Sequence, residues 1–146
     1  MGSNKPASAG NQQERLLSEE ARRWFLAGVV EGEGSVTVAI VRHPTHPFGF
    51  QARPEFFIYQ HRSRRALLEM AQEYFGTGLI RPKPGNEDVL VYSVLSTREL
   101  RGRVVPFLER YMCFSARGAD IDKFLAVLRL FGAGLHRTPH GLCRDR

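Results

Sequence analysis

The chain is short of cysteine, and it contains no long run of apolar residues. Its two cysteines, Cys113 and Cys143, lie far apart and form no CxxC pair, which argues against a structural zinc site or a disulfide framework. No segment reaches the length of a membrane span, and the N-terminus lacks the apolar core of a signal peptide. We therefore expect an intracellular protein in a reducing compartment, with no membrane partner.

Acidic side chains are outnumbered by basic ones, 15 against 21, which gives a formal net charge of +6 over 146 residues. Arginine supplies most of the positive charge, and its guanidinium suits bidentate contacts with phosphate and guanine. A basic domain of this size favours a polyanionic partner such as nucleic acid. The length fits one domain with a hydrophobic core of its own.

Hydrophobic periodicity predicts helices that alternate with β-hairpins. We expect a helix from an N-cap at Ser18 to the glycines at 32 and 34, strands over 35–41 and 50–60, and a helix over 64–75 that ends at Gly76. Strands over 78–82 and 89–94 follow, then a helix over 97–109 that Pro106 breaks or restarts, and a last helix over 119–131.

This order predicts an α+β fold with one four-stranded antiparallel sheet, covered on one face by helices. Residues 1–16 are expected to be disordered, 17–132 to form the domain, and 133–146 to be a basic, flexible tail. Four aromatic residues, Trp24, Phe25, Phe75 and Phe131, are expected to pack in the core, and Cys113 to be buried.

The sheet face without helices is the candidate nucleic-acid surface. Strand alternation places a row of mostly polar side chains there, and such a row on a twisted sheet can follow a DNA major groove. A solvated sheet face is the alternative, but apolar side chains on this face would be costly in water and could contact thymine methyls. The expected DNA-binding residues are Thr37, Ala39, Val41, Gln51, Arg53, Glu55, Phe57, Tyr59, Arg81, Lys83, Val91 and Ser93.

The segment Leu26–Gly34, with the sequence LAGVVEGEG, combines closely spaced glycines with two acidic residues. Gly28 and Gly32 lie four residues apart on one helical face, so a second backbone can approach closely there. Glu31 and Glu33 follow at the C-terminal end, where the helix dipole favours a cation. Two such helices around a two-fold axis would bring their acids together as a hard-oxygen site for Mg²⁺.

This segment resembles the signature of the LAGLIDADG homing endonucleases, which it matches at Leu26, Ala27, Gly28 and Gly34, and conservatively at the other apolar and acidic positions. A second stretch, FFIYQHRSRRALL from Phe56 to Leu68, resembles the family's strand-to-helix junction after the first hairpin. The resemblance extends over residues 24–131 and implies the family's ααββαββα fold. A single copy of the signature implies a homodimer.

The resemblance assigns the metal to Glu33, where many members have aspartate, with Gly32 beside it. Glu31 is then a structural residue. Mg²⁺ is the implied cofactor, with Mn²⁺ or Ca²⁺ as substitutes. The implied dimer interface comprises Leu26, Ala27, Gly28, Glu31 and Gly32.

Three further catalytic positions follow from the same resemblance. Gln60 and Arg64 fall on positions that arrange solvent and phosphate around the active site. Arg117, before the last helix, is similar to the basic position that polarises the scissile phosphate. Arg110 and Lys123 are alternatives for that position.

The implied function is a site-specific homing endonuclease that makes metal-dependent double-strand breaks at a long pseudo-palindromic DNA site and leaves short 3′ overhangs. The cytoplasm is then the expected compartment, or an organelle if an intron there encodes the protein. Two alternatives with the same fold stay open: an intron-encoded RNA maturase, for which RNA is the partner, and a non-catalytic DNA-binding regulator.

Two other sites are less favoured by the residues. His43 and His46 could belong to an HNH-type metal site, but no third ligand stands at a suitable spacing. The Glu-Gly-Glu-Gly segment could be read as a phosphate loop, but it lacks the Lys-Ser/Thr pair of such loops.

Overall fold

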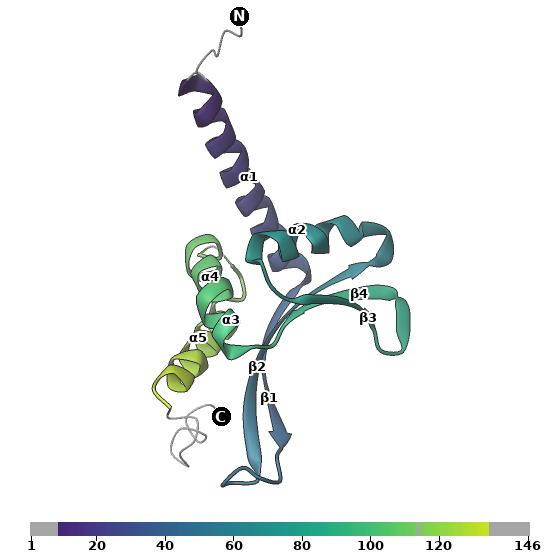
Figure 1. Ribbon diagram of the computed structural model, residues 1–146, viewed down its shortest axis with the longest axis vertical. Coiled ribbons are helices and arrows are strands. Elements are labelled where there is room, and N and C mark those ends of the chain that lie inside the picture. The colour runs from purple at the N-terminus through teal and green to yellow at the C-terminus, as the bar shows by residue number, and fades with distance from the viewer. Residues whose placement is uncertain (1–8, 114, 135–146) are drawn as a thin grey trace, which may run out of the picture.

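The computed structural model describes residues 9–113 and 115–134. A long helix, α1 (Ala9–Glu33), leads directly into the hairpin of β1 (Gly34–Arg42) and β2 (Phe50–His61), as Figure 1 shows. A 3-10 turn, η1 (Arg62–Arg64), and helix α2 (Arg65–Phe75) follow, and then the hairpin of β3 (Leu79–Lys83) and β4 (Asn86–Val94). The chain ends with α3 (Thr97–Glu99), the π-helical turn η2 (Leu100–Val104), α4 (Val105–Tyr111) and α5 (Gly118–Gly132).

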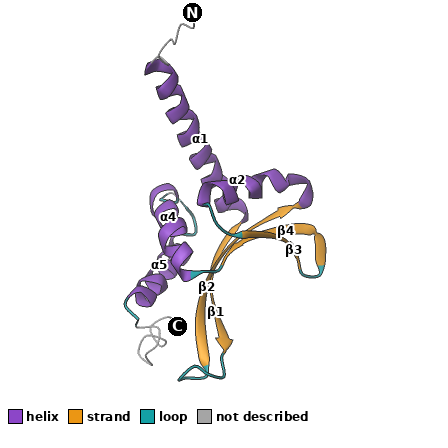
Figure 2. Ribbon diagram, in the orientation of Figure 1, coloured by secondary structure: helices purple, strands orange, loops and turns teal. Residues whose placement is uncertain are grey.

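The four strands form one antiparallel sheet in the order β1-β2-β4-β3, as expected for this α+β fold. In β2 the side chains of Phe56 and Ile58 are fully buried, whereas Phe57 and Tyr59, which alternate with them, are only half-buried. The two hairpins diverge, and the helices lie on the side of the sheet away from the angle between them (Figure 2). The sheet therefore has a helix-covered face and an open, concave face.

The core lies between the covered face of the sheet and the helices. Aromatic rings from three elements meet there, because Phe75 of α2 packs within 5.6 Å of Phe56 and 5.3 Å of Phe107, measured between ring centroids. Ile121, Phe124, Leu125 and Leu128 of α5 are buried in the same core, as their helical spacing predicted.

Helix α1 differs from the expected helix. It begins at Ala9, so Ser18 lies inside the helix and is not its N-cap, and residues 9–16 of the segment expected to be disordered are helical. Within the described residues a single helix precedes the first hairpin, where the resemblance implied two. Residues 1–8 and 135–146 lie outside the described residues, as does Cys143.

The expected burial of four aromatic residues is only partly correct. Phe75 is fully buried, but Phe25 is 57% exposed and Trp24 is 43% exposed. Trp24 contacts the ring of Tyr111 edge-on, with the centroids 5.0 Å apart, and Phe25 faces outward from α1. Cys113, expected to be buried, is exposed. The periodicity identified an apolar face of α1, but the chain alone does not cover all of it.

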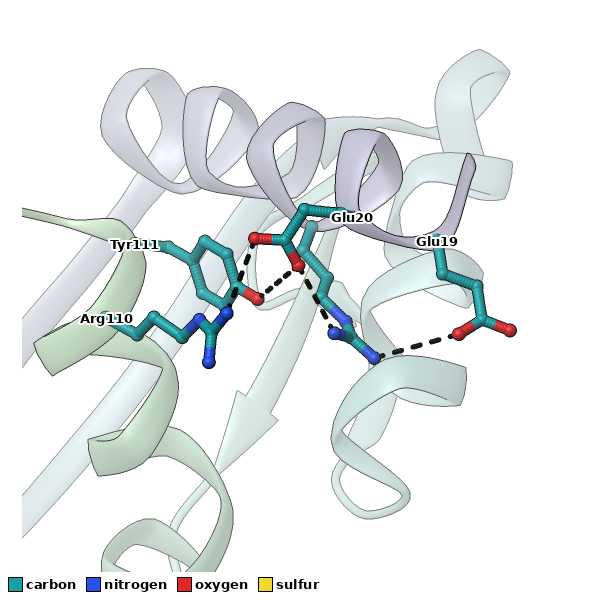
Figure 3. A network of polar contacts seen from close by, with 5 residues as sticks. Glu19, Glu20, Arg110 and Tyr111 are labelled. Atoms are coloured by element: carbon teal, nitrogen blue, oxygen red, sulfur yellow. Dashed lines mark hydrogen bonds and ion pairs between the residues drawn. The ribbon is translucent and has the colours of Figure 1, made fainter. Parts of the chain in front are cut away.

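Polar contacts attach α1 to α4 (Figure 3). The hydroxyl of Tyr111 donates to the carboxylate of Glu20 at 2.9 Å, and this hydrogen bond lowers the pKa of Glu20 below its usual value. Arg110 and Arg23 pair with the same carboxylate at 3.7 and 3.3 Å. These contacts fix the direction of α1 relative to the core, while residues of α1 further toward the N-terminus project beyond it.

Pro106 does not end the helix: it lies in the first turn of α4, which continues directly from the π-helical turn η2. None of the helices in the described part of the chain is long and apolar enough to cross a membrane.

The turn between α2 and β3 depends on two glycines and one tyrosine. Gly76 caps α2 with a φ of +64°, as predicted, and Gly78 has a φ of +91°. Burial raises the pKa of Tyr92 far above its ordinary value, so its hydroxyl stays protonated and donates to the carbonyl of Thr77 at 2.8 Å. A Cβ at Gly78 would lie 2.5 Å from the Tyr92 ring.

Gly78→Ala should therefore destabilise the fold more than Gly85→Ala. Gly85 also has a positive φ, +79°, but a Cβ there would meet nothing within 4 Å. We expect Gly85→Ala to lower the free energy of unfolding by about 1–2 kcal/mol from the positive φ alone. Gly78→Ala should cost clearly more, because the Tyr92 ring must also move. Urea denaturation measures both, and equal losses would contradict the role given to Tyr92.

Candidate active site and nucleic-acid interface

The candidate active site lies where α1 meets β1. Glu33 is the last residue of the helix and Gly34 is the first of the strand, with no loop between them. Gly34 is buried, and a Cβ there would overlap the carbonyl oxygen of Val30 in the last turn of α1. Glycine at 34 is thus required for the close approach of strand and helix, and it fixes the place of Glu33.

The side chain of Glu33 is exposed, and no hydrogen bond or ion pair joins its carboxylate to another described residue. It stands beside the last carbonyl groups of α1, which have no partners further along the helix. A free carboxylate and backbone carbonyls are the oxygen ligands that Mg²⁺ and Ca²⁺ prefer. Among the described residues, no group of three or more His, Cys, Asp or Glu could hold a metal. Glu33 and Gly32 therefore fit as part of a metal site that needs further ligands.

Glu31 has a different role from Glu33. Its carboxylate accepts a hydrogen bond from the Ser115 hydroxyl at 2.5 Å and another from the Ala116 N–H at 3.1 Å. These bonds attach the segment before α5 to the end of α1. This agrees with the structural role expected for Glu31, and it removes Glu31 from the group of residues free to contact a partner.

Arg117 is the basic residue that the fold brings to the junction. Its guanidinium donates to the carbonyl oxygen of Gly34, directly after Glu33, and its N–H donates to Ser115 Oγ at 3.0 Å. The alternatives lie elsewhere, since Arg110 pairs with Glu20 on α1 and Lys123 is an exposed residue of α5. Of the three candidates, Arg117 is the one in contact with the signature segment.

Gln60 lies near the end of β2, and Arg64 follows it at the end of η1. Because Gly34 pairs with Ile58, the register brings Gln60 past the end of β1, alongside the last turn of α1. Gln60 is buried and Arg64 is exposed at the start of α2. The neighbouring arginines are ion-paired, Arg62 with Asp88 at 3.1 Å and Arg65 with Glu69 at 2.8 Å. Arg64 has no such partner among the described residues, which leaves its guanidinium available to an anion.

The flank of α1 that carries Gly28 and Gly32 is open. A Cβ at either glycine would meet nothing within 4 Å, and exposed Phe25 lies on the same flank. Leu26 and Ala27, also expected at a dimer interface, are instead buried in the chain's own core at 1% and 6% exposure. The helix turns these two side chains inward, so little of either is left to contact a partner.

All twelve residues expected to bind DNA lie on the open face of the sheet. On β1 and β2 they form the cross-strand pairs Thr37–Glu55, Ala39–Arg53 and Val41–Gln51. The row continues into β4 and β3 through the pairs Phe57–Ser93, Tyr59–Val91 and Arg81–Val91, and Lys83 ends it on β3. Lys83 stands over the ring of Tyr59, with its Nζ 5.8 Å from the centroid. Arg81 has no ion-pair partner among the described residues. The histidines of the alternative metal site, His43 and His46, lie at the β1–β2 hairpin tip, where His43 contacts Thr45.

Sequence reasoning missed two contacts of this site. Ser115 and Glu31 are 84 residues apart in the chain, and a lone serine before a helix gives no signal of a distant partner. The Arg53–Glu55 pair on the sheet face, with Nε and Oε1 2.6 Å apart, could have been found, because residues two apart on a strand share a face.

This fold, with an acidic helix end at the edge of a concave sheet, is that of the LAGLIDADG endonuclease family, whose model matches residues 26–128. The chain belongs to this family. It is 36% identical over 116 residues to the DNA endonuclease I-CeuI of Chlamydomonas moewusii, an alignment that covers 77% of this chain and 53% of that relative. The chain thus spans about half the length of I-CeuI.

Solved structures agree in fold. The structure of the group I intron-encoded homing endonuclease I-CeuI complexed with DNA matches with a TM-score of 0.78 and 34% identity, over 84% of this chain and 60% of that chain. The meganuclease I-SmaMI bound to uncleavable DNA matches with a TM-score of 0.80 and 27% identity, over 85% and 41% of the two chains.

The Ser115–Glu31 contact can be tested by Ser115→Ala. A hydrogen bond to a carboxylate is stronger than one between neutral groups, so its loss at this partly exposed site should lower the free energy of unfolding by about 1–2 kcal/mol. Ser63→Ala is the control, because Ser63 contacts only the exposed His61 ring, at 2.8 Å, and its change should be smaller. Chemical denaturation measures both. Equal losses would show that Ser115 does not hold the α5 segment to α1.

Proposed function

We propose that two copies of this chain form a homodimer that binds a long pseudo-palindromic site on double-stranded DNA and hydrolyses one phosphodiester in each strand. The observation that carries the proposal is Glu33, an exposed carboxylate with no hydrogen bond or ion pair to another described residue, fixed at the end of a helix whose flank is open at Gly28 and Gly32. Cleavage at staggered positions leaves short 3′ overhangs. Membership of the LAGLIDADG family and the DNA-bound relatives support this function.

The open sheet face binds the DNA. Its width of four strands and its row of polar, basic and aromatic side chains suit the major groove, where base edges present donors, acceptors and thymine methyls. Arg64, which is exposed and has no ion-pair partner among the described residues, contacts a phosphate. A two-fold dimer places two such sheets on the two half-sites, which explains a pseudo-palindromic target.

Glu33 and the carbonyl group of Gly32 would hold a divalent cation. When bound, Mg²⁺ supplies an activated water and charge stabilisation at the phosphate, with Mn²⁺ or Ca²⁺ as substitutes. Gln60 holds water by its amide at the junction. Arg117 keeps the junction rigid through the Gly34 carbonyl, and its remaining N–H groups stabilise negative charge that develops on the phosphate.

The dimer and the active site are one arrangement. Gly28 and Gly32 lack a side chain where the helix is open, so the second α1 can approach closely there, and exposed Phe25 gains cover. Close approach brings the two Glu33 carboxylates to neighbouring positions. A single chain, with one such carboxylate, holds half of the site.

Glu33→Gln should abolish cleavage while DNA affinity changes by less than about tenfold, because most ground-state contacts come from the sheets. Glutamine has nearly the same shape but is a much weaker ligand for a divalent cation. Cleavage of a randomised duplex library with Mg²⁺, followed by sequencing of the cut ends, measures activity, overhang and symmetry together. Glu73→Gln, an exposed carboxylate of α2, is the matched control.

Undiminished cleavage by Glu33→Gln would overturn the metal assignment. Sequence-specific DNA binding without any cleavage by the unaltered protein would instead favour a regulator. RNA binding that assists splicing and survives Glu33→Gln would favour the maturase.

Gly28→Val should convert the dimer to monomers and so remove cleavage. Three added heavy atoms on the open flank of α1 would hold the partner helix away. Light scattering or sedimentation measures the molar mass in solution. Gly102→Val is the control, since a Cβ at this helical glycine also meets nothing within 4 Å and it lies away from α1. A Gly28→Val protein that remains dimeric would contradict the interface.

A further inference from the structure

We infer that Arg53 and Glu55 act as one guanine-reading unit on the DNA-binding face, an assignment that rests on the proposed function. Both side chains come from β2 and point to the open face of the sheet, opposite Ala39 and Thr37 of β1. The Nε of Arg53 lies 2.6 Å from Oε1 of Glu55.

The exposure of the two side chains differs in a way that matters for recognition. The Arg53 side chain is 49% exposed, whereas that of Glu55 is only 11% exposed. The carboxylate therefore sits below the surface and the guanidinium above it. Because Glu55 occupies Nε, the two Nη groups are the donors left for a ligand, and they form a fork that matches O6 and N7 of guanine.

The charge of the unit also favours a base over a phosphate. A guanidinium with a carboxylate 2.6 Å away is close to neutral as a pair, so it attracts a phosphate weakly and releases few counterions. A base edge carries no net charge, and its recognition depends on direction rather than on charge. By contrast, Arg64 and Arg81 have no ion-pair partner among the described residues and keep their full charge for the DNA.

Glu55 also fixes the rotamer of Arg53 before DNA binds. A free arginine loses rotamer entropy when it is ordered, so a preset side chain loses less on binding. Glu55 is thus a positioning residue, and Arg53 is the residue that contacts the base.

The test uses selection from a randomised duplex library by binding of the full-length protein, without added divalent metal so that cleavage does not interfere. The unaltered protein should enrich a pseudo-palindromic site with guanine at one pair of symmetric positions. R53K keeps the charge but loses the fork, so guanine preference there should fall about tenfold or more, with other positions unchanged. R65K is the matched control, because Arg65 forms a similar pair, on helix α2 rather than on the sheet. Its Nε lies 2.8 Å from Oε1 of Glu69.

E55Q tests whether Arg53 and Glu55 act as one unit or as two independent side chains. It frees the charge of Arg53, so discrimination at the same positions should fall while the dependence of log Kd on log salt steepens by about one for each protomer. A structural ion pair alone would change stability and leave the base profile intact. Circular dichroism and thermal unfolding verify that the variants are folded.

Three results would overturn the assignment. A base profile that R53K leaves unchanged would remove Arg53 as a reader while the proposed function stands. A loss of affinity that R53K spreads evenly over all sequences would make Arg53 a phosphate contact. An unaltered protein that enriches no sequence would overturn the proposed function itself, and the guanine reader with it.

Discussion

The passage from α1 to β1 without a loop is the constraint on which the rest of the structure depends. Gly34 lies so close to the Val30 carbonyl that no side chain fits, and its own carbonyl accepts from Arg117. Glu31, three residues earlier, accepts from Ser115 and Ala116. The junction is therefore held by the strand on one side and by the segment before α5 on the other. Glu33, between these fixed points, owes its position to both, although no hydrogen bond or ion pair joins its carboxylate to another described residue.

The same helix has to satisfy two surfaces. Leu26, Ala27 and Val30 turn inward to the core, while Gly28, Gly32 and Phe25 lie on the open flank. An apolar stripe on one side is sufficient to bury a helix against its own core. At Gly28 and Gly32, nothing in the described part of the chain packs against the second, open flank, which ends at the turn that carries Glu33. In the proposed dimer this flank is what relates one active-site carboxylate to the other.

The sequence predicted the two hairpins, the single four-stranded antiparallel sheet and its open face, because side chains on a strand point alternately to the two faces and one face must be covered. It also led to Glu33, through the signature. The sequence-based prediction failed where the outcome depends on residues that are distant in the sequence or on a partner. Ser18 has the chemistry of an N-cap, but the helix continues through it to Ala9. Trp24 and Phe25 are as apolar as Phe75, and periodicity does not tell whether an apolar side chain meets its own core or a partner. The Glu31–Ser115 contact spans 84 residues, and no local pattern encodes it.

The distribution of charge refines what a net charge of +6 means for binding. Several arginines have acidic partners, among them Arg53 on the open sheet face, and Arg62 and Arg65 on either side of Arg64 and its neighbour Ser63. Exposed pairs of this kind add little to stability, typically about 0–1 kcal/mol. The pairs instead reduce the non-specific electrostatic attraction to DNA, which increases with each unpaired cationic side chain that contacts a phosphate. In the proposed DNA complex, Arg64 and Arg81, which have no ion-pair partner among the described residues, supply affinity, and the Arg53–Glu55 pair on the sheet discriminates between bases. A chain with the same net charge but no such pairs would bind DNA more tightly and choose its site less well.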